Sequence, residues 1–256
     1  MNLELKDQLF LVGGATSGFG KAVAEALISE SAKVIVVARG KEKLLEQYAN
    51  EPLVEIVEGD ITQHATIEQL KKIVGDRQLH GILVNAGGPP AKTVLETTLE
   101  DWDDAYQKIL RWKVELTQAF VPSMIKAGYG RLVYVESSSV KQPIENLVLS
   151  TSLRLAVVGM VKTLSQEIAK SGVTLNILGP GSHNTPAIDR LYVKKSEQTG
   201  LPFDEVKKNA IQQIPVGALG EATDFASLAV WLLSKNSRYI TGQTMLVDGG
   251  MVKGTL

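Results

Sequence analysis

Residues 8–20 read QLFLVGGATSGFG, and this stretch decides the fold. Residues 9–12 form a short apolar run of the kind that makes a buried strand. The run ends in a turn that carries Gly14, Gly18 and Gly20, and the amphipathic sequence KAVAEALISE comes after it. A strand, a glycine-rich turn and a helix in this order are typical of a site for dinucleotide phosphates, because glycines let the backbone approach closely and the helix N-terminus offers N–H groups. A glycine turn alone also occurs where nothing binds, so the interpretation depends on the rest of the chain.

The rest of the chain alternates apolar runs of strand length with helical patterns. Strands are predicted at residues 9–12, 33–38, 53–57, 81–84, 131–135, 173–178 and 243–247. Further helices are predicted at residues 42–48, 64–74, 100–127, 151–171 and 221–234. This alternation predicts a three-layer, doubly wound α/β fold of the Rossmann type with a mainly parallel seven-stranded sheet. Ligands of such sheets bind at the carboxyl ends of the strands.

Nothing in the 256 residues looks like a linker, so we predict one domain spanning residues 1–256. The one long connection, residues 182–215, is polar and irregular, with some helical pattern at 188–197 and 204–213. We expect this connection to form a mobile lid over a substrate cleft.

Composition excludes several classes of protein. With 27 basic and 28 acidic side chains and no basic run, nucleic-acid binding has little support. The chain has no cysteine, and its three histidines lie without ligand spacing, so we predict no metal site. No apolar run approaches the roughly 20 residues that a membrane span needs, and the polar N-terminus lacks a signal-like segment. We therefore expect a soluble cytoplasmic protein that binds neither nucleic acid nor membrane.

Several motifs in a fixed order identify a family. VGGATSGFG at residues 12–20, LVNAGG at 83–88 and the Pro-Gly pair at 180–181 resemble motifs of the short-chain dehydrogenase/reductase family. The resemblance covers essentially the whole chain, and residues 214–250 are similar to the C-terminal third of 3-oxoacyl-[acyl-carrier-protein] reductases. It implies a dinucleotide site formed by Gly14, Thr16, Ser17, Gly18, Phe19, Gly20, Arg39, Asp60, Ile61, Asn85, Ala86, Gly87, Pro180, Gly181 and Thr185.

Arg39 bears on which dinucleotide binds. In NAD sites an acidic residue after the second strand binds the ribose 2′-hydroxyl, whereas a basic residue suits the 2′-phosphate of NADP. Here Arg39 follows that strand, Lys41 is close by, and the first acidic residue is Glu42. The sequence favours NADP(H) over NAD(H), and the alternative is that Arg39 is only a solvated loop charge.

The catalytic residues of the family are mostly replaced. The resemblance places Ser137 at the catalytic serine, although the adjacent serines leave the position open by one residue. It places Ser150 where the family has its proton-transferring tyrosine, Arg154 where it has a lysine, and Ile109 where it has the asparagine that supports a proton relay. Only one of the four catalytic residues is therefore present.

These replacements weaken proton transfer. A serine hydroxyl is far less acidic than a tyrosine phenol, whose pKa is about 10, so Ser150 is a poor proton donor near neutrality. Arg154 could hold ribose hydroxyls, bind a substrate carboxylate or phosphate through both arms of its fork, or be a helix surface charge. Lys141 is our candidate proton donor if Arg154 lies beside it, and Glu136 could pair with either cation. Tyr192 and His183, in or beside the lid, are weaker candidates.

The sequence leaves three functional hypotheses open. The first is a divergent NADP(H)-dependent oxidoreductase of the 3-oxoacyl-reductase type that acts on a small carbonyl or acyl substrate, with a catalytic set of Ser137, Ser150, Arg154 and Lys141. The second is a non-catalytic dinucleotide-binding protein or scaffold subunit. The third is a binding protein that holds an anionic ligand on Arg154. The family resemblance also implies a homodimer or homotetramer, paired through residues 100–127 and 151–171.

Overall fold

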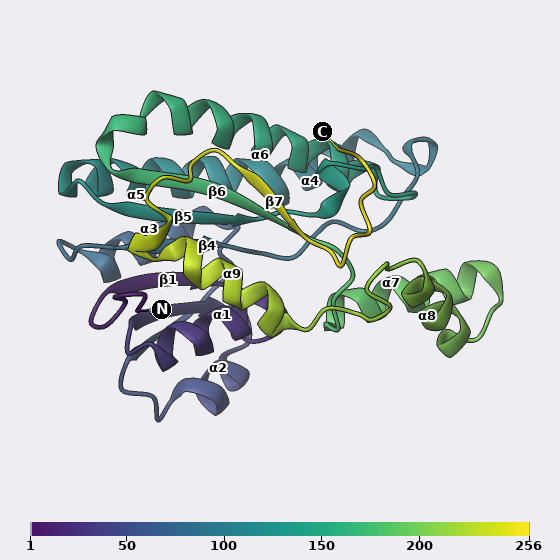
Figure 1. Cartoon of the computed structure of the whole chain (residues 1–256), viewed down its shortest axis with the longest axis horizontal. Coiled ribbons are helices and arrows are strands. Elements are labelled where there is room, and N and C mark those ends of the chain that lie inside the picture. Colours follow the sequence, from purple (N-terminus) through teal and green to yellow (C-terminus); the bar gives the residue numbers. More distant parts are fainter. Residues whose placement is uncertain (1, 256) are drawn as a thin grey trace.

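The computed structural model describes residues 2–255, and its strands form one parallel sheet in the order β3-β2-β1-β4-β5-β6-β7 (Figure 1). The strands are β1 (Leu9–Gly13), β2 (Lys33–Ala38), β3 (Val54–Glu58), β4 (Gly81–Val84), β5 (Gly130–Val135), β6 (Val173–Pro180) and β7 (Thr244–Val247). Every neighbouring pair is parallel. The predicted seven-stranded Rossmann-type sheet is confirmed, and it is parallel throughout.

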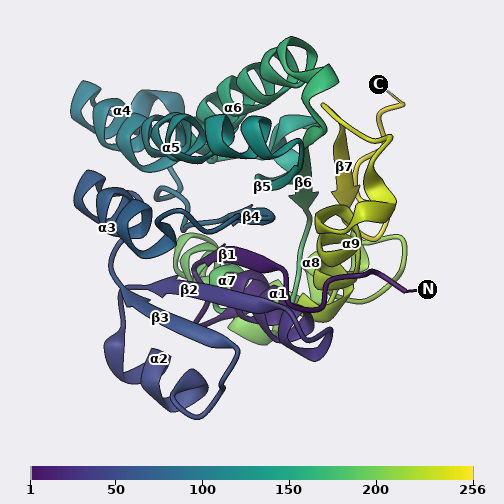
Figure 2. The same cartoon turned by 90° about the vertical axis from the view of Figure 1, so that its left-hand side faces the viewer.

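Helices cover both faces of this sheet (Figure 2). They are α1 (Gly18–Ser29), α2 (Lys41–Tyr48), α3 (His64–Val74), α4 (Leu99–Tyr106), α5 (Trp112–Ala127), α6 (Val148–Glu167), α7 (Pro186–Thr199), α8 (Phe203–Gln212) and α9 (Ala222–Leu233). One face carries α1, α2 and α9, and the other carries α3, α5 and α6. Each face has its own apolar core, which makes three layers in all.

Successive side chains of a strand point to opposite faces of the sheet, so they alternate between these two cores. In β1, Phe10 and Val12 belong to the core beside α1 and α9, whereas Leu9 and Leu11 belong to the core beside α3 and α5. Because helices cover both sides, the central strands are apolar at successive positions instead of alternating with polar residues. This explains why short continuous apolar runs predicted the sheet correctly.

The helix predicted at residues 100–127 contains an interruption. The segment η2 (Gln107–Arg111) is a π-helix between α4 and α5, and Ile109, in the middle of it, is buried. A π-helical turn holds an extra residue, so it rotates the side chains of α5 relative to those of a regular helix. Trp112, Lys113 and Leu116 all face the interior directly after the turn.

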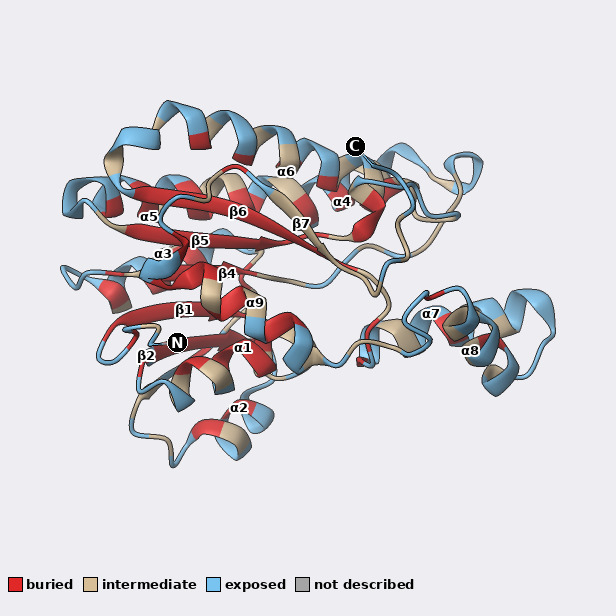
Figure 3. Ribbon diagram, viewed as in Figure 1, coloured by how far each residue is buried: buried red, intermediate tan, exposed pale blue. Residues whose placement is uncertain are grey.

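The helical pattern at residues 188–197 and 204–213 is confirmed as α7 and α8, and these helices leave less of residues 182–215 irregular than the sequence predicted. Pro186 begins α7 and Gly200, with φ of 71°, ends it, as expected for helix start and stop residues. The two helices project away from the sheet, and most of their surface is exposed (Figure 1, Figure 3). Their polar character reflects that exposure: Tyr192 in α7 and Val206 in α8 are their buried residues.

Helix α6 is long and apolar enough, by length and composition, to cross a membrane. It lies along the sheet, and Val157 and Val161 on its inner face join the core shared with α5. A core helix of a globular domain passes the same test, so this finding is weak evidence for a membrane span.

Candidate functional site

Loops from four strands meet at the carboxyl edge of the sheet. Asn85, after β4, donates its side-chain amide to the carbonyl of Gly13 at the end of β1, at 3.0 Å. A Cβ placed on Gly18 would lie 3.5 Å from the methyl group of Thr185, which follows β6. A Cβ placed on Gly179, in β6, would lie 3.0 Å from the carbonyl oxygen of Ser137, which follows β5. The motifs that the sequence separates by more than 160 residues therefore form one site.

The glycine-rich turn leaves no room for side chains. A Cβ on Gly20 would lie 2.3 Å from the Gly14 carbonyl oxygen, and Gly14 and Gly18 have φ of 65° and 53°, which favours glycine. The hydroxyl of Tyr48 donates to the carbonyl of Ala15 at 2.7 Å and fixes the turn from α2. The turn is thus a preformed backbone cradle.

The start of α1 has the donors that a pyrophosphate needs. Ser17 caps α1, but its side chain makes no capping hydrogen bond to the first-turn N–H groups. Those N–H groups, next to Gly18 and Gly20, suit an anionic ligand at the positive end of the helix dipole. Thr16 and Ser17 lie in the same turn, and the ring of Phe19 packs on Phe225 with centroids 4.3 Å apart. The residues present fit a dinucleotide phosphate.

Arg39, Asp60 and Ile61 lie around the end of β2. Arg39 follows the last residue of β2, is exposed, and has no ion pair within residues 2–255. Nearby, Lys41 lies 3.9 Å from Glu58. Asp60 accepts two hydrogen bonds from Thr62 on one carboxylate oxygen, and the buried Ile61 side chain lies against Gly13. Arg39 is therefore available to a ligand phosphate.

The loop after β4, in the middle of the sheet, and the loop after β6, toward its other end, complete this edge. Asn85 and Ala86 are half-buried and Gly87 is open, with nothing within 4 Å of a Cβ placed on it. Pro180, the last residue of β6, is buried. A Cβ on Gly181 would lie 2.7 Å from the Asp248 side chain, and the buried Thr185 caps the start of α7.

Ser150 and Arg154, one turn apart on α6, form a buried pair. The Nε of Arg154 donates to the Ser150 hydroxyl oxygen at 3.0 Å. One terminal nitrogen, Nη1, donates to the carbonyl of Val135 at 3.1 Å and to the carboxylate of Glu136 at 2.9 Å. The Arg154 side chain is only 9% exposed, so the interpretation as a surface charge was wrong. Each edge of its fork is already in use, which leaves no free pair of donors for bidentate capture of an anion.

Glu136, at the end of β5, binds a second cation that sequence reasoning missed. Its fully buried carboxylate contacts the Lys113 ammonium through one oxygen and Arg154 through the other. Burial lowers the pKa of Lys113 to about 8; Arg154 also lowers it, and Glu136 opposes the change. The sequence did contain a signal for this contact. Lys113 shares a helix face with the apolar residues Ile109, Trp112 and Leu116, and a charged side chain on an apolar face needs a buried partner of opposite charge.

The remaining catalytic candidates lie in different environments. Ser137 is half-buried, and its hydroxyl oxygen accepts from the N–H of Ser139 at 3.1 Å. Ser138 and Ser139 are more deeply buried than Ser137, which favours Ser137 as the exposed hydroxyl of the three. Lys141 is exposed, and within the described chain it forms no ion pair; Glu136 pairs instead with Lys113 and Arg154.

The two weaker candidates, His183 and Tyr192, are both buried. His183 is buried and lies edge-on to the Phe19 ring, 5.0 Å between centroids. Tyr192 is buried in α7, with its ring 6.3 Å from that of Phe203. Both rings pack against aromatic neighbours, and His183 Nε2 and the Tyr192 hydroxyl are buried without a hydrogen-bond partner among the described residues.

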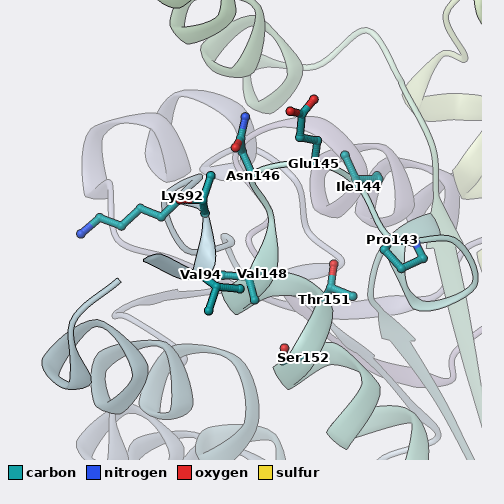
Figure 4. A pocket seen from close by; sticks show the side chains of 10 residues that line it. Lys92, Val94, Pro143, Ile144, Glu145, Asn146, Val148, Thr151 and Ser152 are labelled. Atoms are coloured by element: carbon teal, nitrogen blue, oxygen red, sulfur yellow. The ribbon is translucent and has the colours of Figure 1, made fainter. Parts of the chain in front are cut away.

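A cavity of about 310 Å³ lies at the start of α6, beside the loop that precedes it (Figure 4). It is lined by Lys92, Thr93, Val94, Pro143, Ile144, Glu145, Asn146, Val148, Thr151 and Ser152. Thr151 and Ser152 directly follow Ser150 on α6, so the cavity adjoins the Ser150–Arg154 pair. The cavity is next to the catalytic candidates but contains none of them.

Comparisons with known proteins agree with this geometry. The family model described as enoyl-(acyl carrier protein) reductase matches residues 14–252. The 3-oxoacyl-[acyl-carrier-protein] reductase of Haemophilus influenzae is 30% identical over 252 residues, which cover 96% of this chain and 99% of the relative.

Solved structures share the whole fold. L-sorbose reductase from Gluconobacter frateurii, solved with NADPH and L-sorbose, superposes with a TM-score of 0.92 at 23% identity and covers 99% of this chain and 100% of its own. An actinorhodin polyketide ketoreductase variant with NADPH gives a TM-score of 0.91 at 26% identity, covering 97% and 98% of the two chains. From the glycine cradle, the parallel sheet and a family match over nearly the full length, we conclude that the chain belongs to the short-chain dehydrogenase/reductase family.

Proposed function

We propose that this protein is an NADP(H)-dependent oxidoreductase that interconverts a carbonyl group and an alcohol on a small carbonyl or acyl substrate. The observation that carries the proposal is the buried Ser150–Arg154 hydrogen bond at the same sheet edge as an intact glycine cradle. The curated relative that reduces 3-oxoacyl groups and the ketoreductase solved with NADPH support the reaction class.

The cofactor would be held along the carboxyl edge of the sheet. The α1 N-terminus and the glycine cradle would bind the pyrophosphate, and Arg39 would bind the 2′-phosphate that distinguishes NADP(H). Asn85–Gly87 and Pro180–Thr185 would line the nicotinamide end. When bound, the nicotinamide supplies or accepts the hydride.

Two hydroxyl groups are oriented to hold the substrate oxygen. Ser150 accepts a hydrogen bond from Arg154, and Ser137 accepts one from Ser139, so each hydroxyl hydrogen is free to donate elsewhere. The fixed positive charge of Arg154 favours negative charge that develops on that oxygen, and it needs no reorganisation during the reaction. Lys141 stays our candidate for delivering the proton that completes the alcohol.

A specific observation also favours a second function, a non-catalytic dinucleotide-binding or scaffold subunit. Ser150 cannot match a tyrosine as a proton donor, and the exposed Lys141 has no observed contact with Arg154. In this alternative the cradle binds the dinucleotide and Arg154 is structural.

Location, assembly and lid movement complete the proposal. We infer a cytoplasmic homodimer or homotetramer, paired through α5 and α6, in which the α7–α8 segment moves as a lid over the substrate. The groove of about 390 Å³ between α5 and α6, lined by residues such as Val114, Met160 and Leu164, supports helix pairing between subunits.

Two experiments separate the functions. Calorimetric titration with NADPH and NADH distinguishes a dinucleotide-binding protein from one that binds neither. NADPH absorbance with a panel of 3-oxoacyl thioesters and small ketones then tests for turnover. Turnover that falls strongly in Arg154→Met and remains in the matched α6 control Ser152→Ala supports the oxidoreductase. NADPH binding without turnover on any substrate supports the scaffold.

A further inference from the structure

The cluster around Glu136 has one more positive charge than negative charge. Glu136 is fully buried and lies between Lys113 from α5 and Arg154 from α6, which are 3% and 9% exposed. Arg154 alone would neutralise the carboxylate, so Lys113 is not needed for charge balance. Burying an additional cation is costly, and such a group survives where it serves a purpose or can lose its proton.

The surroundings of Lys113 contain little else that could hold its charge. From its own helix the Trp112 ring lies 5.7 Å from the ammonium, from β5 the carboxylate of Glu136 contacts it, and from α6 Arg154 faces the same carboxylate. The neighbouring Tyr134 hydroxyl is hydrogen-bonded to Thr117 at 2.7 Å, and its burial raises its pKa. Within the described residues Glu136 is the one carboxylate that contacts both cations, and Lys113 and Arg154 also repel each other directly.

Arg154 is held so that few of its donors remain free. Its Nε and Nη1 are engaged by Ser150, Val135 and Glu136, while Nη2 lies 3.4 Å from a Cβ placed on Gly88, in the loop after β4. The guanidinium therefore presents one nitrogen toward the cofactor-binding edge. How much positive charge it presents depends on how strongly Glu136 neutralises it.

We propose that Lys113 is a positioning residue that, through Glu136, sets how strongly Arg154 polarises the Ser150 hydroxyl and attracts ligand oxygen atoms. When Lys113 is protonated, the negative charge of Glu136 is shared between two cations, so less of the positive charge of Arg154 is neutralised. When Lys113 loses its proton, Glu136 neutralises Arg154 alone. The proposal rests on the proposed function for its ligand, and the pKa of Lys113 of about 8 places the change within an accessible pH range. Arg154 therefore holds negatively charged ligand oxygens more strongly at a pH below the pKa of Lys113, where Lys113 is protonated.

Carbon-detected NMR of the Arg154 guanidinium in the ligand-free protein tests the coupling directly. We expect its signal to shift between pH 7 and 9.5 together with that of the Lys113 side chain. The shift is expected to vanish in Lys113→Met, and in Lys113→Arg the signal should stay near its low-pH position. Lys108→Met, an exposed lysine paired with Asp104 on the preceding helical segment, is the control and should keep the shift. A shift that persists in Lys113→Met, or an Arg154 signal that stays constant while Lys113 titrates, overturns the proposal, as does a Lys113 that does not titrate in this range.

A second measurement separates this proposal from the proposed function. The Kd for NADPH in the wild type is expected to rise by about fivefold from pH 7 to 9.5, a typical coupling between sites. The same change should be absent in Lys113→Met and present in Lys108→Met. A pH-independent Kd in the wild type overturns the proposed effect on the ligand. If NADPH does not bind at any pH, the proposed function fails, and the guanidinium titration still decides the role of Lys113.

Discussion

Glu136 is the residue whose loss the site would tolerate least. It separates Lys113 from Arg154, and neither cation has another carboxylate partner in residues 2–255. Removing one partner of a buried ion pair leaves an uncompensated charge, whereas removing an exposed carboxylate costs little. The stability of this side of the sheet therefore depends on a contact among three elements, α5, β5 and α6.

The substitution Glu136→Gln tests this dependence. We expect the free energy of unfolding, measured in urea, to fall by about 3–5 kcal/mol, because two buried cations lose their common carboxylate. The exposed Glu145→Gln is the matched control and should stay within about 0.5 kcal/mol of the wild type. Adding Lys113→Met to Glu136→Gln should recover part of the loss, since one unpaired cation is removed. Equal stability of Glu136→Gln and wild type would contradict the importance of the cluster.

Lys113 also predicts how stability varies with pH. Its pKa is about 8 in the folded protein and 10.5 as its ordinary value, so between these pH values the unfolded chain binds more protons than the folded one. The free energy of unfolding should therefore rise as the pH increases through this window, by up to about 3 kcal/mol across its full width. Urea unfolding at pH 7.5 to 9.5 should show this rise in the wild type relative to Lys113→Met. A difference between the two that does not change with pH would show that Lys113 has an ordinary pKa.

At the scale of elements, the turn between β1 and α1 has the strictest requirement on its sequence. A Cβ on Gly20 would lie within 2.6 Å of both the Gly13 and Gly14 carbonyl oxygens, and neither backbone atom can move without displacing β1 or α1. Gly40, before α2, has no atom within 4 Å of an added Cβ and an extended backbone with φ of −94°. The two glycines therefore differ in what an alanine would do.

We predict that Gly20→Ala lowers the free energy of unfolding by about 1–3 kcal/mol, as overpacked substitutions do, and weakens NADPH binding by displacing the phosphate cradle. Gly40→Ala should leave both properties near the wild-type values. Urea unfolding and calorimetry on the two variants check this. Wild-type affinity for NADPH in Gly20→Ala would show that the turn does not hold the phosphates.

Most elements could be predicted from the sequence because each has a local signal. Strand-length apolar runs identified all the strands of the sheet, and helix α3 was placed at its observed residues, 64–74. The π-helix at Gln107–Arg111 was missed because its extra residue shifts the phase of the apolar pattern inside a continuous helical stretch, with no glycine or proline at residues 107–111 to mark the place. Helices α7 and α8 were underestimated because they project from the sheet and bury few residues.

The catalytic candidates were harder to predict for a different reason. Ser150 and Arg154 are four residues apart on one helix, and this spacing alone brings their side chains together. The partners of Glu136 lie 23 and 18 residues away on separate helices, so their contact depends on packing that no local pattern reports. A pairing of Glu136 with Arg154 was among the expectations, whereas a pairing with Lys113 was not.

At the scale of the whole molecule, the glycine cradle and the buried Ser150–Arg154 pair share the carboxyl edge of the sheet. Asn85 ties the loop after β4 to the end of β1, and the α7–α8 segment follows β6 at the same edge. We therefore predict that the dinucleotide still binds although Ser150, Arg154 and Ile109 stand where the family resemblance implies a tyrosine, a lysine and an asparagine. Catalysis would then depend on fixed charge and oriented hydroxyls more than on an acidic phenol.

The most direct test is calorimetric titration of the purified chain with NADPH and with NADH. We predict that both bind, that NADPH binds more tightly, and that Arg39→Ala removes most of the difference, because Arg39 is exposed directly after β2, where a basic residue suits the 2′-phosphate, and forms no ion pair within residues 2–255. A chain that binds neither nucleotide at millimolar concentration would contradict the existence of a working dinucleotide site.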